Sequence, residues 1–253
     1  RLTDVTGVQT CALPIYLKHD IMNPLADERL LWLYERCTLP AAPRLLDIGC
    51  GNGHAALLLA RGAGARCTLV DSSQQWITEA GRRFAAAGLT PLADTHCIDA
   101  DAYTPEEGSY DIALCLGTAP VYGGFGQALR RLAPALRSGG YVIVGEPTLD
   151  VTPPLRYQDY LRRLGWELPS ARRLLRELVE AGYELLATLR STGDEWDRYM
   201  ALQWQAIVEH ADARPEDAQA QSFREWMRDE QEVYLRYQRR YVDWNVLLLR
   251  LKT

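Results

Sequence analysis

The sequence predicts an α/β protein with one doubly wound, mostly parallel sheet. Short apolar runs typical of buried strands alternate with segments of helical pattern along most of the chain. The first strand, Leu45 to Ile48, runs into the loop Gly49 to Gly53, and the Ala- and Leu-rich segment His54 to Arg61 follows as a helix. This order is typical of sites for nucleotide-like ligands, because glycine lets the backbone come close and the helix start offers free N–H groups.

Seven strands are predicted, at 45–48, 66–70, 95–98, 110–116, 141–144, 183–189 and 245–251. Because helical patterns separate most of them, ligands should sit beyond the carboxyl ends of the parallel strands. Two aromatic-rich helical segments lie between the last two strands, at about 194–241. We expect them to form an inserted helical lid that folds back over the sheet.

Composition indicates a single soluble globular domain. The chain has 253 residues, of which 47% are hydrophobic and 24% charged. A formal charge of -5 and a pI near 5.5 predict no nucleic-acid partner and favour a small ligand. No apolar run reaches the length of a membrane span, and six scattered cysteines indicate neither a disulfide framework nor a zinc site. We expect a cytoplasmic protein with no membrane partner; the pattern does not predict an oligomeric state.

The first 43 residues divide into two predicted parts. Residues 4–15 resemble the in-frame translation of a DNA-sequencing adapter, so we interpret segment 1–15 as non-native, with an irregular native arm as the alternative. Residues 16–43 are expected to form a helical cap around the helical pattern of Leu25 to Arg36. The main domain is then 44–253.

Acidic residues recur where the predicted strands end. Asp71 ends the second strand about 20 residues beyond the glycine loop, where a carboxylate can accept hydrogen bonds from ribose hydroxyls. Asp99 follows the third strand and Glu146 the fifth. Asp47 lies two residues before the first glycine, where its charge would repel a pyrophosphate but suits a positively charged sulfonium. A dinucleotide site, which the glycine spacing formally allows, is therefore the less favoured interpretation.

The segment Leu46 to Gly53 resembles the first motif of class I S-adenosylmethionine-dependent methyltransferases, and Asp71, Asp99-Ala100, the Asp111 strand and Ser138-Gly139-Gly140 follow in that family's order. The resemblance implies a Rossmann-like sheet with an antiparallel last strand, S-adenosylmethionine as donor, S-adenosylhomocysteine as product, and no metal. It places the glycines near the methionine part, Asp71 at the ribose, and Asp99 with Ala100 at the adenine. The residues so assigned to the donor are Asp47, Gly49, Gly51, Gly53, Asp71, Ser72, Asp99, Ala100, Leu116 and Gly117.

A wider resemblance, carried by His19, Asn23-Pro24, Glu146-Pro147 and Trp196 to Tyr199, extends to a poorly characterised group of bacterial small-molecule methyltransferases. The group often has aromatic residues where this chain has Pro120, Thr148 and Leu149. These positions are expected to border the acceptor, so the group's substrates are not carried over.

Four residues are candidates for the acceptor side of the site. Glu146 is the first choice for holding or deprotonating the acceptor and His19 the second, with a capping, ion-pairing or packing role as the alternative for each. Tyr122 and Tyr199 could line the pocket by hydrogen bonding. The lid tryptophans are expected to form the lid interior, or alternatively to face a cationic acceptor or the sulfonium.

Methyl transfer from a sulfonium is an in-line displacement with a neutral leaving group, so positioning can supply much of the catalysis and a base is needed only for protonated acceptors. The sequence therefore predicts an enzyme that methylates a small molecule. The alternatives are a non-catalytic module that binds the same cofactor and, against the acidic charge, a methyltransferase for RNA or protein. His96, Cys97 and Asp99 are close in sequence but predict no metal site, because successive strand residues face opposite ways.

Overall fold

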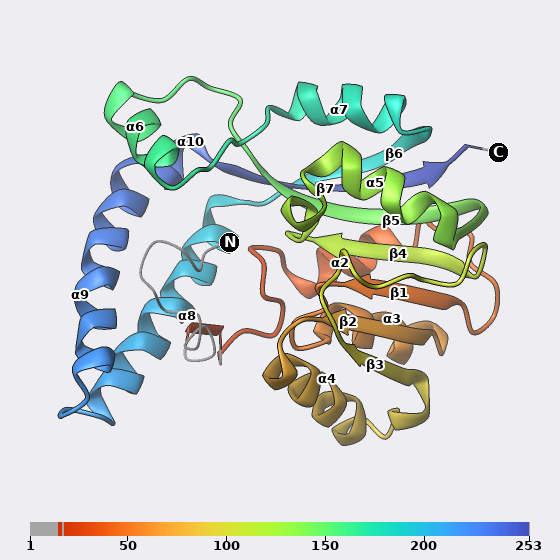
Figure 1. Ribbon diagram of the computed structural model, residues 1–253, viewed down its shortest axis with the longest axis horizontal. Helices are drawn as coiled ribbons and strands as arrows, with labels where there is room; N and C mark the ends of the chain where they lie inside the picture. The colour runs from red at the N-terminus through yellow and green to blue at the C-terminus, as the bar shows by residue number, and fades with distance from the viewer. Residues whose placement is uncertain (1–14, 17, 253) are drawn as a thin grey trace.

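A computed structural model of the chain describes residues 15, 16 and 18–252 (Figure 1). The predicted non-native segment 1–15 therefore lies outside the described residues, except for Ile15. The centre of the fold is a seven-stranded sheet with the order β3-β2-β1-β4-β5-β7-β6. Strand β7 is antiparallel to both neighbours, and the other pairs are parallel. The strands are β1 Arg44–Ile48, β2 Arg66–Asp71, β3 Ala93–Cys97, β4 Tyr110–Leu116, β5 Leu136–Thr148, β6 Tyr183–Arg190 and β7 Asp243–Leu251.

Helices cover both faces of this sheet, which confirms the predicted doubly wound α/β fold. In β1, Leu45 packs with the apolar residues of α2, α3 and α4, whereas Leu46 packs with those of α5 and α7. The two leucines separate in this way because successive side chains of a strand point to opposite faces. The helices around the sheet are α2 Asp27–Tyr34, α3 His54–Ala63, α4 Gln74–Ala86, α5 Phe125–Leu132 and α7 Ala171–Glu180. α6 Leu155–Arg163 packs instead against the segment before β7.

The glycine loop turns the chain from β1 into α3, as predicted. Gly49, Gly51 and Gly53 have φ angles of 70°, 52° and 72°, in the left-handed region that residues with a Cβ rarely adopt. A Cβ on Gly49 would lie 2.0 Å from the Oγ1 atom of Thr118, and one on Gly53 would lie 2.8 Å from the Cβ atom of Ala80. The glycines are therefore required both by the turn and by the close approach of neighbouring segments.

Two long helices, α8 (Gly193–Asp212) and α9 (Ala218–Val233), are inserted between β6 and β7. Thr192 and Glu195 form a capping box at the start of α8, and Asp217 caps α9 through its side chain. A π-helical turn, Tyr234–Gln238, and the short α10, Arg239–Tyr241, lead on to β7. We call residues 193–241 the helical insertion; Figure 1 shows α8 and α9 beyond the carboxyl ends of the parallel strands.

The segment before β1 connects this insertion to the rest of the fold. The backbone N–H of Ala26 donates to Glu195 Oε1 of α8 at 2.9 Å, and Arg29 of α2 forms an ion pair with the same carboxylate. The hydroxyl of Ser191, just before the insertion, donates to the carbonyl of Pro24. The helix of the predicted cap is shorter than expected, and residues 18–26 precede it without regular structure.

One strand differs from the prediction. β5 begins at Leu136 rather than at residue 141, so it includes the turn-prone residues Ser138-Gly139-Gly140. The register between β4 and β5 shifts at this point, so an irregularity in the ladder accommodates the turn-prone residues. Within residues 18–252, the helices are too short or too polar to cross a bilayer.

Replacing Gly53 with Ala should destabilise the protein more than replacing Gly64 with Ala. Gly53 precedes α3 and Gly64 follows it, with positive φ angles of 72° and 65°. Each substitution therefore carries a backbone strain of about 1–2 kcal/mol. Only Gly53 has a neighbour in the way, because the space around a Cβ on Gly64 is open to 4 Å. Urea unfolding of both variants measures the difference. Equal losses would show that the loop does not pack against α4 as described.

Candidate active site

The carboxyl ends of the parallel strands open into a cavity of about 1230 Å³. The glycine loop and the ends of β1, β2, β4 and β5 form one side, and the helical insertion and the α6–α7 connection form the other. Candidate residues that line the cavity are Asp47, Gly49, Gly51, Asp71, Ser72, Leu116, Gly117, Glu146 and Tyr199. The structure thus brings together most of the residues that the sequence predicts for donor and acceptor.

Asp71 fastens the glycine loop to the start of α4. Its Oδ2 atom accepts a hydrogen bond from the backbone N–H of Gly51 at 3.0 Å, and Oδ1 accepts one from Ser73 at 2.9 Å. Burial raises the pKa of Asp71, and these two hydrogen bonds act in the opposite direction. Each carboxylate oxygen can accept a second bond, so the side chain is positioned at the cavity wall with acceptor capacity left.

Asp47 is a second carboxyl group beside Asp71, and it is only 3% exposed. Its Oδ2 atom has no hydrogen-bond partner among the described residues. Burial, and then the charge of Asp71, raise the pKa of Asp47 to about 8. Because a buried carboxylate is costly without a counter-charge, this end of the cavity favours a ligand with positive charge.

Glu146 supplies a third carboxyl group, from β5. It is 5% exposed, lines the cavity, and its Oε1 atom has no partner among the described residues. Burial raises the pKa of Glu146 to about 8, and the charge of Glu177 acts in the same direction. Neither alternative role expected for Glu146 is observed in the described part of the chain, where it caps no helix and forms no ion pair.

Aromatic side chains form much of the opposite wall. Trp196 and Trp204 of α8 line the cavity, as does Trp244 at the start of β7. The indole N–H groups of all three are buried and find no acceptor within the described chain. Trp244 lies against Gly145, where a Cβ would come within 2.7 Å of its ring. Trp196 and Trp204 of the helical insertion therefore border the cavity.

His19 lies behind the cavity wall rather than in it. Its ring is 2% exposed, and Nε2 lies 3.0 Å from the carbonyl oxygen of Tyr199. The ring also packs edge-on against Tyr16 and Tyr199, with centroids 5.5 Å and 5.0 Å away. Burial lowers the pKa of His19. These contacts connect the amino-terminal segment to α8, which is the packing role rather than the catalytic one.

Tyr122 and the adenine-side candidates also lie off the cavity wall. The hydroxyl of Tyr122 donates to the carbonyl of Ala100 at 3.0 Å, so it supports the loop after β3. Asp99 is exposed, Ala100 is buried, and neither borders the cavity. Gly53 is also absent from the wall, because it packs against α4. Residues 18–252 hold no cluster of side chains suited to bind a metal ion.

Several cavity residues were not predicted. Trp166 and the segment 167–169, between α6 and α7, border the cavity together with Arg173 and Glu177 of α7. Glu230 of α9 also lines it and accepts a hydrogen bond from Tyr160 at 2.8 Å. The side chain of Arg173 is 44% exposed although it reaches the cavity. The sequence of an amphipathic helix does not indicate which of its polar residues lines a cavity.

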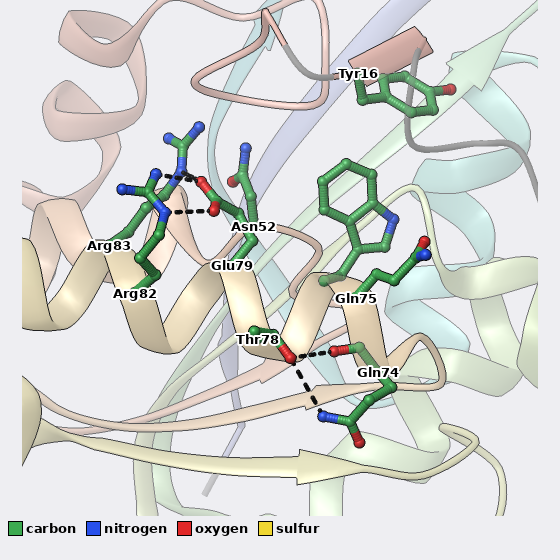
Figure 2. Close-up of a pocket in the computed structure, with 9 residues that line it drawn as sticks. Tyr16, Asn52, Gln74, Gln75, Thr78, Glu79, Arg82 and Arg83 are labelled. Carbon is green, nitrogen blue, oxygen red and sulfur yellow. Dashed lines mark hydrogen bonds and ion pairs between the residues drawn. The ribbon is translucent and has the colours of Figure 1, made fainter.

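A second, smaller cavity of about 310 Å³ lies along α4 (Figure 2). Its charged groups already bind one another: Glu79 accepts hydrogen bonds from Arg82 and Arg83 at 2.7–2.9 Å. The hydrogen bond from Arg82 is the largest cause that lowers the pKa of Glu79 to about 2. Since these groups satisfy one another, the larger cavity is the candidate active site.

Comparison with known proteins agrees with this geometry. Residues 45–140 match the family described as methyltransferase domain. The chain is 29% identical over 236 residues to the Escherichia coli protein YjhP, described as uncharacterized, covering 92% of this chain and 94% of that protein. It is 28% identical over 172 residues to a trans-aconitate 2-methyltransferase from Paracidovorax citrulli, covering 65% of this chain and 64% of the relative.

A solved methyltransferase structure is similar over almost the whole chain. It comes from Geobacter sulfurreducens, contains S-adenosyl-L-homocysteine, and superposes with a TM-score of 0.85 at 29% identity, covering 94% of this chain and 96% of that one. Residues 45–140 thus carry a methyltransferase domain, and the chain as a whole has the fold of S-adenosylmethionine-dependent methyltransferases.

Replacing Glu146 with Gln should stabilise the ligand-free protein increasingly as the pH rises. The pKa of Glu146 is raised from 4.5 to about 8 in the folded protein, so its contribution to stability is fully present below about pH 4.5 and is lost as the pH rises through about 8. The difference in unfolding free energy between variant and wild type should therefore change by up to about 1.4 kcal/mol per pH unit.

Urea unfolding at about pH 5 and about pH 8 measures this difference. Glu180→Gln, on the exposed side of α7, is the matched control and should show no such trend. A pH-independent difference for the Glu146 variant would mean that this carboxyl group is hydrated in solution.

Proposed function

We propose that the protein transfers a methyl group from S-adenosylmethionine to a small-molecule acceptor bound in the same cavity. The observation that carries the proposal is a pair of buried carboxyl groups with unpartnered oxygens, Asp47 and Glu146, at the carboxyl ends of β1 and β5. Asp47 belongs to the donor end and Glu146 to the acceptor end. One end alone would support binding of a cofactor but not transfer to a second molecule.

The donor end fits S-adenosylmethionine. The glycine loop offers backbone where a side chain would intrude, since a Cβ on Gly51 would come within 2.7 Å of Met22 Sδ. Asp71 has acceptor capacity for ribose hydroxyls, and the buried charge of Asp47 suits the cationic methionine part. When bound, the donor supplies an electrophilic methyl group and leaves as a neutral thioether, so no residue of the chain need protonate it.

Asp99 and Ala100 belong to this proposal only through resemblance, since neither lines the cavity. Ser72 lies in the wall beside Asp71, and Leu116 and Gly117 lie between the donor end and Glu146. We place the reacting atoms near Leu116 and Gly117.

The acceptor end lies between Glu146 and the helical insertion. A cavity of about 1230 Å³ exceeds the roughly 300–1,000 Å³ typical of a single ligand pocket, so it can hold donor and acceptor together. We propose that α8 and α9 act as the lid, excluding water and aligning the acceptor for in-line attack. Tyr199 belongs to this wall. The size of the cavity and the presence of Glu146 favour catalysis over a non-catalytic module.

The proposal is tested by measuring S-adenosylhomocysteine release with a panel of amines, phenols, thiols and carboxylates, after calorimetry has established donor binding. Donor binding together with release in the presence of at least one small molecule is expected. Failure to bind S-adenosylmethionine would refute the proposed function outright.

Replacing Asp71 with Ala should weaken the binding of S-adenosylhomocysteine by about 10- to 100-fold, or about 1.4–2.7 kcal/mol. The variant loses an acceptor for the ribose and also the hydrogen bonds that hold Gly51 and Ser73. Asp71→Asn, which keeps the shape and one acceptor oxygen, should lose less. Isothermal titration calorimetry measures the affinities, with Asp94→Ala on the exposed part of β3 as control. Unchanged affinity in the Ala variant would remove the ribose from this position.

A further inference from the structure

The charges around the cavity are strongly unequal. Six of the described lining residues are acidic: Asp47, Asp71, Glu146, Glu167, Glu177 and Glu230. Among the same described residues only Arg173 is basic. A cavity of this kind lowers the free energy of a bound cation and raises that of a bound anion.

The single arginine does not change this balance, because two glutamates already bind it. Arg173 Nε donates to Glu177 Oε1 at 2.7 Å, and Arg173 Nη1 donates to Glu167 Oε1 at 2.7 Å. Glu177 Oε2 also accepts a hydrogen bond from the backbone N–H of Gly126 at 3.0 Å. An anionic acceptor would therefore meet an arginine whose charge two carboxylates already balance.

The two acids on the acceptor side lack such partners. Only 5% of the surface of Glu146 is exposed, and its Oε1 atom has no partner among the described residues. Glu230, across the cavity on α9, has a hydrogen bond from Tyr160 but no ion pair in the described chain. Both carboxyl groups can therefore accept hydrogen bonds from a ligand.

Aromatic rings complete this surface. Trp196 and Trp204 of α8 line the same wall of the cavity, and Trp226 lies on α9 one turn before Glu230. Indole faces attract alkylammonium groups and also contact the apolar body of a ligand. Carboxylates and indoles together are suited to a cation that carries a hydrocarbon or aromatic group.

We propose that the methyl acceptor is an amine with an apolar body, bound in its ammonium form through Glu146, with Glu230 and the tryptophans of the helical insertion contributing to the preference. This inference rests on the proposed function. It separates the protein from its relative named for trans-aconitate, a carboxylate.

The proton balance of the reaction gives Glu146 a defined role. An ammonium group has no lone pair, so R–NH₃⁺ must first give one proton to the carboxylate of Glu146. The nitrogen lone pair of R–NH₂ then forms the N–C bond while the C–S bond breaks, and sulfur retains that electron pair. The products are R–NH₂CH₃⁺, a neutral thioether and a protonated Glu146, which passes its proton to solvent. One proton is released for each methyl group transferred.

The test compares three probes that share one body and differ in charge: phenethylammonium, 2-phenylethanol and 3-phenylpropanoate. Each is titrated into the protein saturated with S-adenosylhomocysteine, and binding is followed by calorimetry and by tryptophan fluorescence. We expect phenethylammonium to bind at least about tenfold more tightly than either other probe, as one charge-assisted hydrogen bond in a buried site would give.

Variants assign this preference to the proposed residues. Glu146→Gln and Glu230→Gln should each reduce it and the double variant should abolish it, whereas Glu225→Gln, on the exposed side of α9, should retain it. With amine acceptors, Glu146→Gln should also lower kcat more than it raises KM, which a purely structural role would not produce.

Three results would overturn the amine inference. The first is binding of 3-phenylpropanoate as tight as that of phenethylammonium, and the second is no binding of the cation at any soluble concentration. The third is a cation preference that survives in the double variant. In each case normal binding of S-adenosylhomocysteine leaves the proposed methyltransferase function intact, whereas loss of that binding in wild type would refute the function itself.

Discussion

The carboxylate of Asp71 holds the donor end of the cavity together. Its two oxygens bind the backbone N–H groups of Gly51 and Ser73, so one side chain joins the end of β2, the glycine loop and the start of α4. Asp47 of the neighbouring strand then stays buried beside it without a counter-charge among the described residues. Burial of the Asp47 carboxylate, and then its repulsion by Asp71, is an electrostatic cost that a cationic ligand relieves.

The acceptor end depends on contacts between segments that are far apart in sequence. Glu195 of α8 binds the chain before α2, and Asp197 accepts hydrogen bonds from Tyr234 and Arg239, each at 2.6 Å, near the return to β7. The first contact thus ties the start of the helical insertion to the amino-terminal segment, and the contacts of Asp197 join the two ends of the insertion to each other. These attachments place the tryptophans of α8 opposite Glu146, so the lid and the sheet share one cavity.

Residues close to a strand end could be placed from sequence because their position is a local property. Asp71 and Glu146 follow apolar runs, and parallel strands bring their carboxyl ends to one edge. The sequence predicts His19 and Tyr122 as acceptor-side residues from the chemistry of their side chains. The structure places both behind the wall of the cavity. Glu230 escaped prediction because an amphipathic helix does not reveal which polar residue faces a partner.

By itself the sequence determined the alternation of strands and helices, the glycine loop and the acids that follow the strands, because hydrophobic period and backbone freedom act over a few residues. Only the tertiary structure decided which acids lose their water and partners, and which aromatic residues meet across the cavity. Burial and charge balance depend on segments such as β5, α7 and α9 that the chain brings together from far apart. The methyltransferase fold therefore follows from local pattern, and the proposed chemistry of the acceptor from packing.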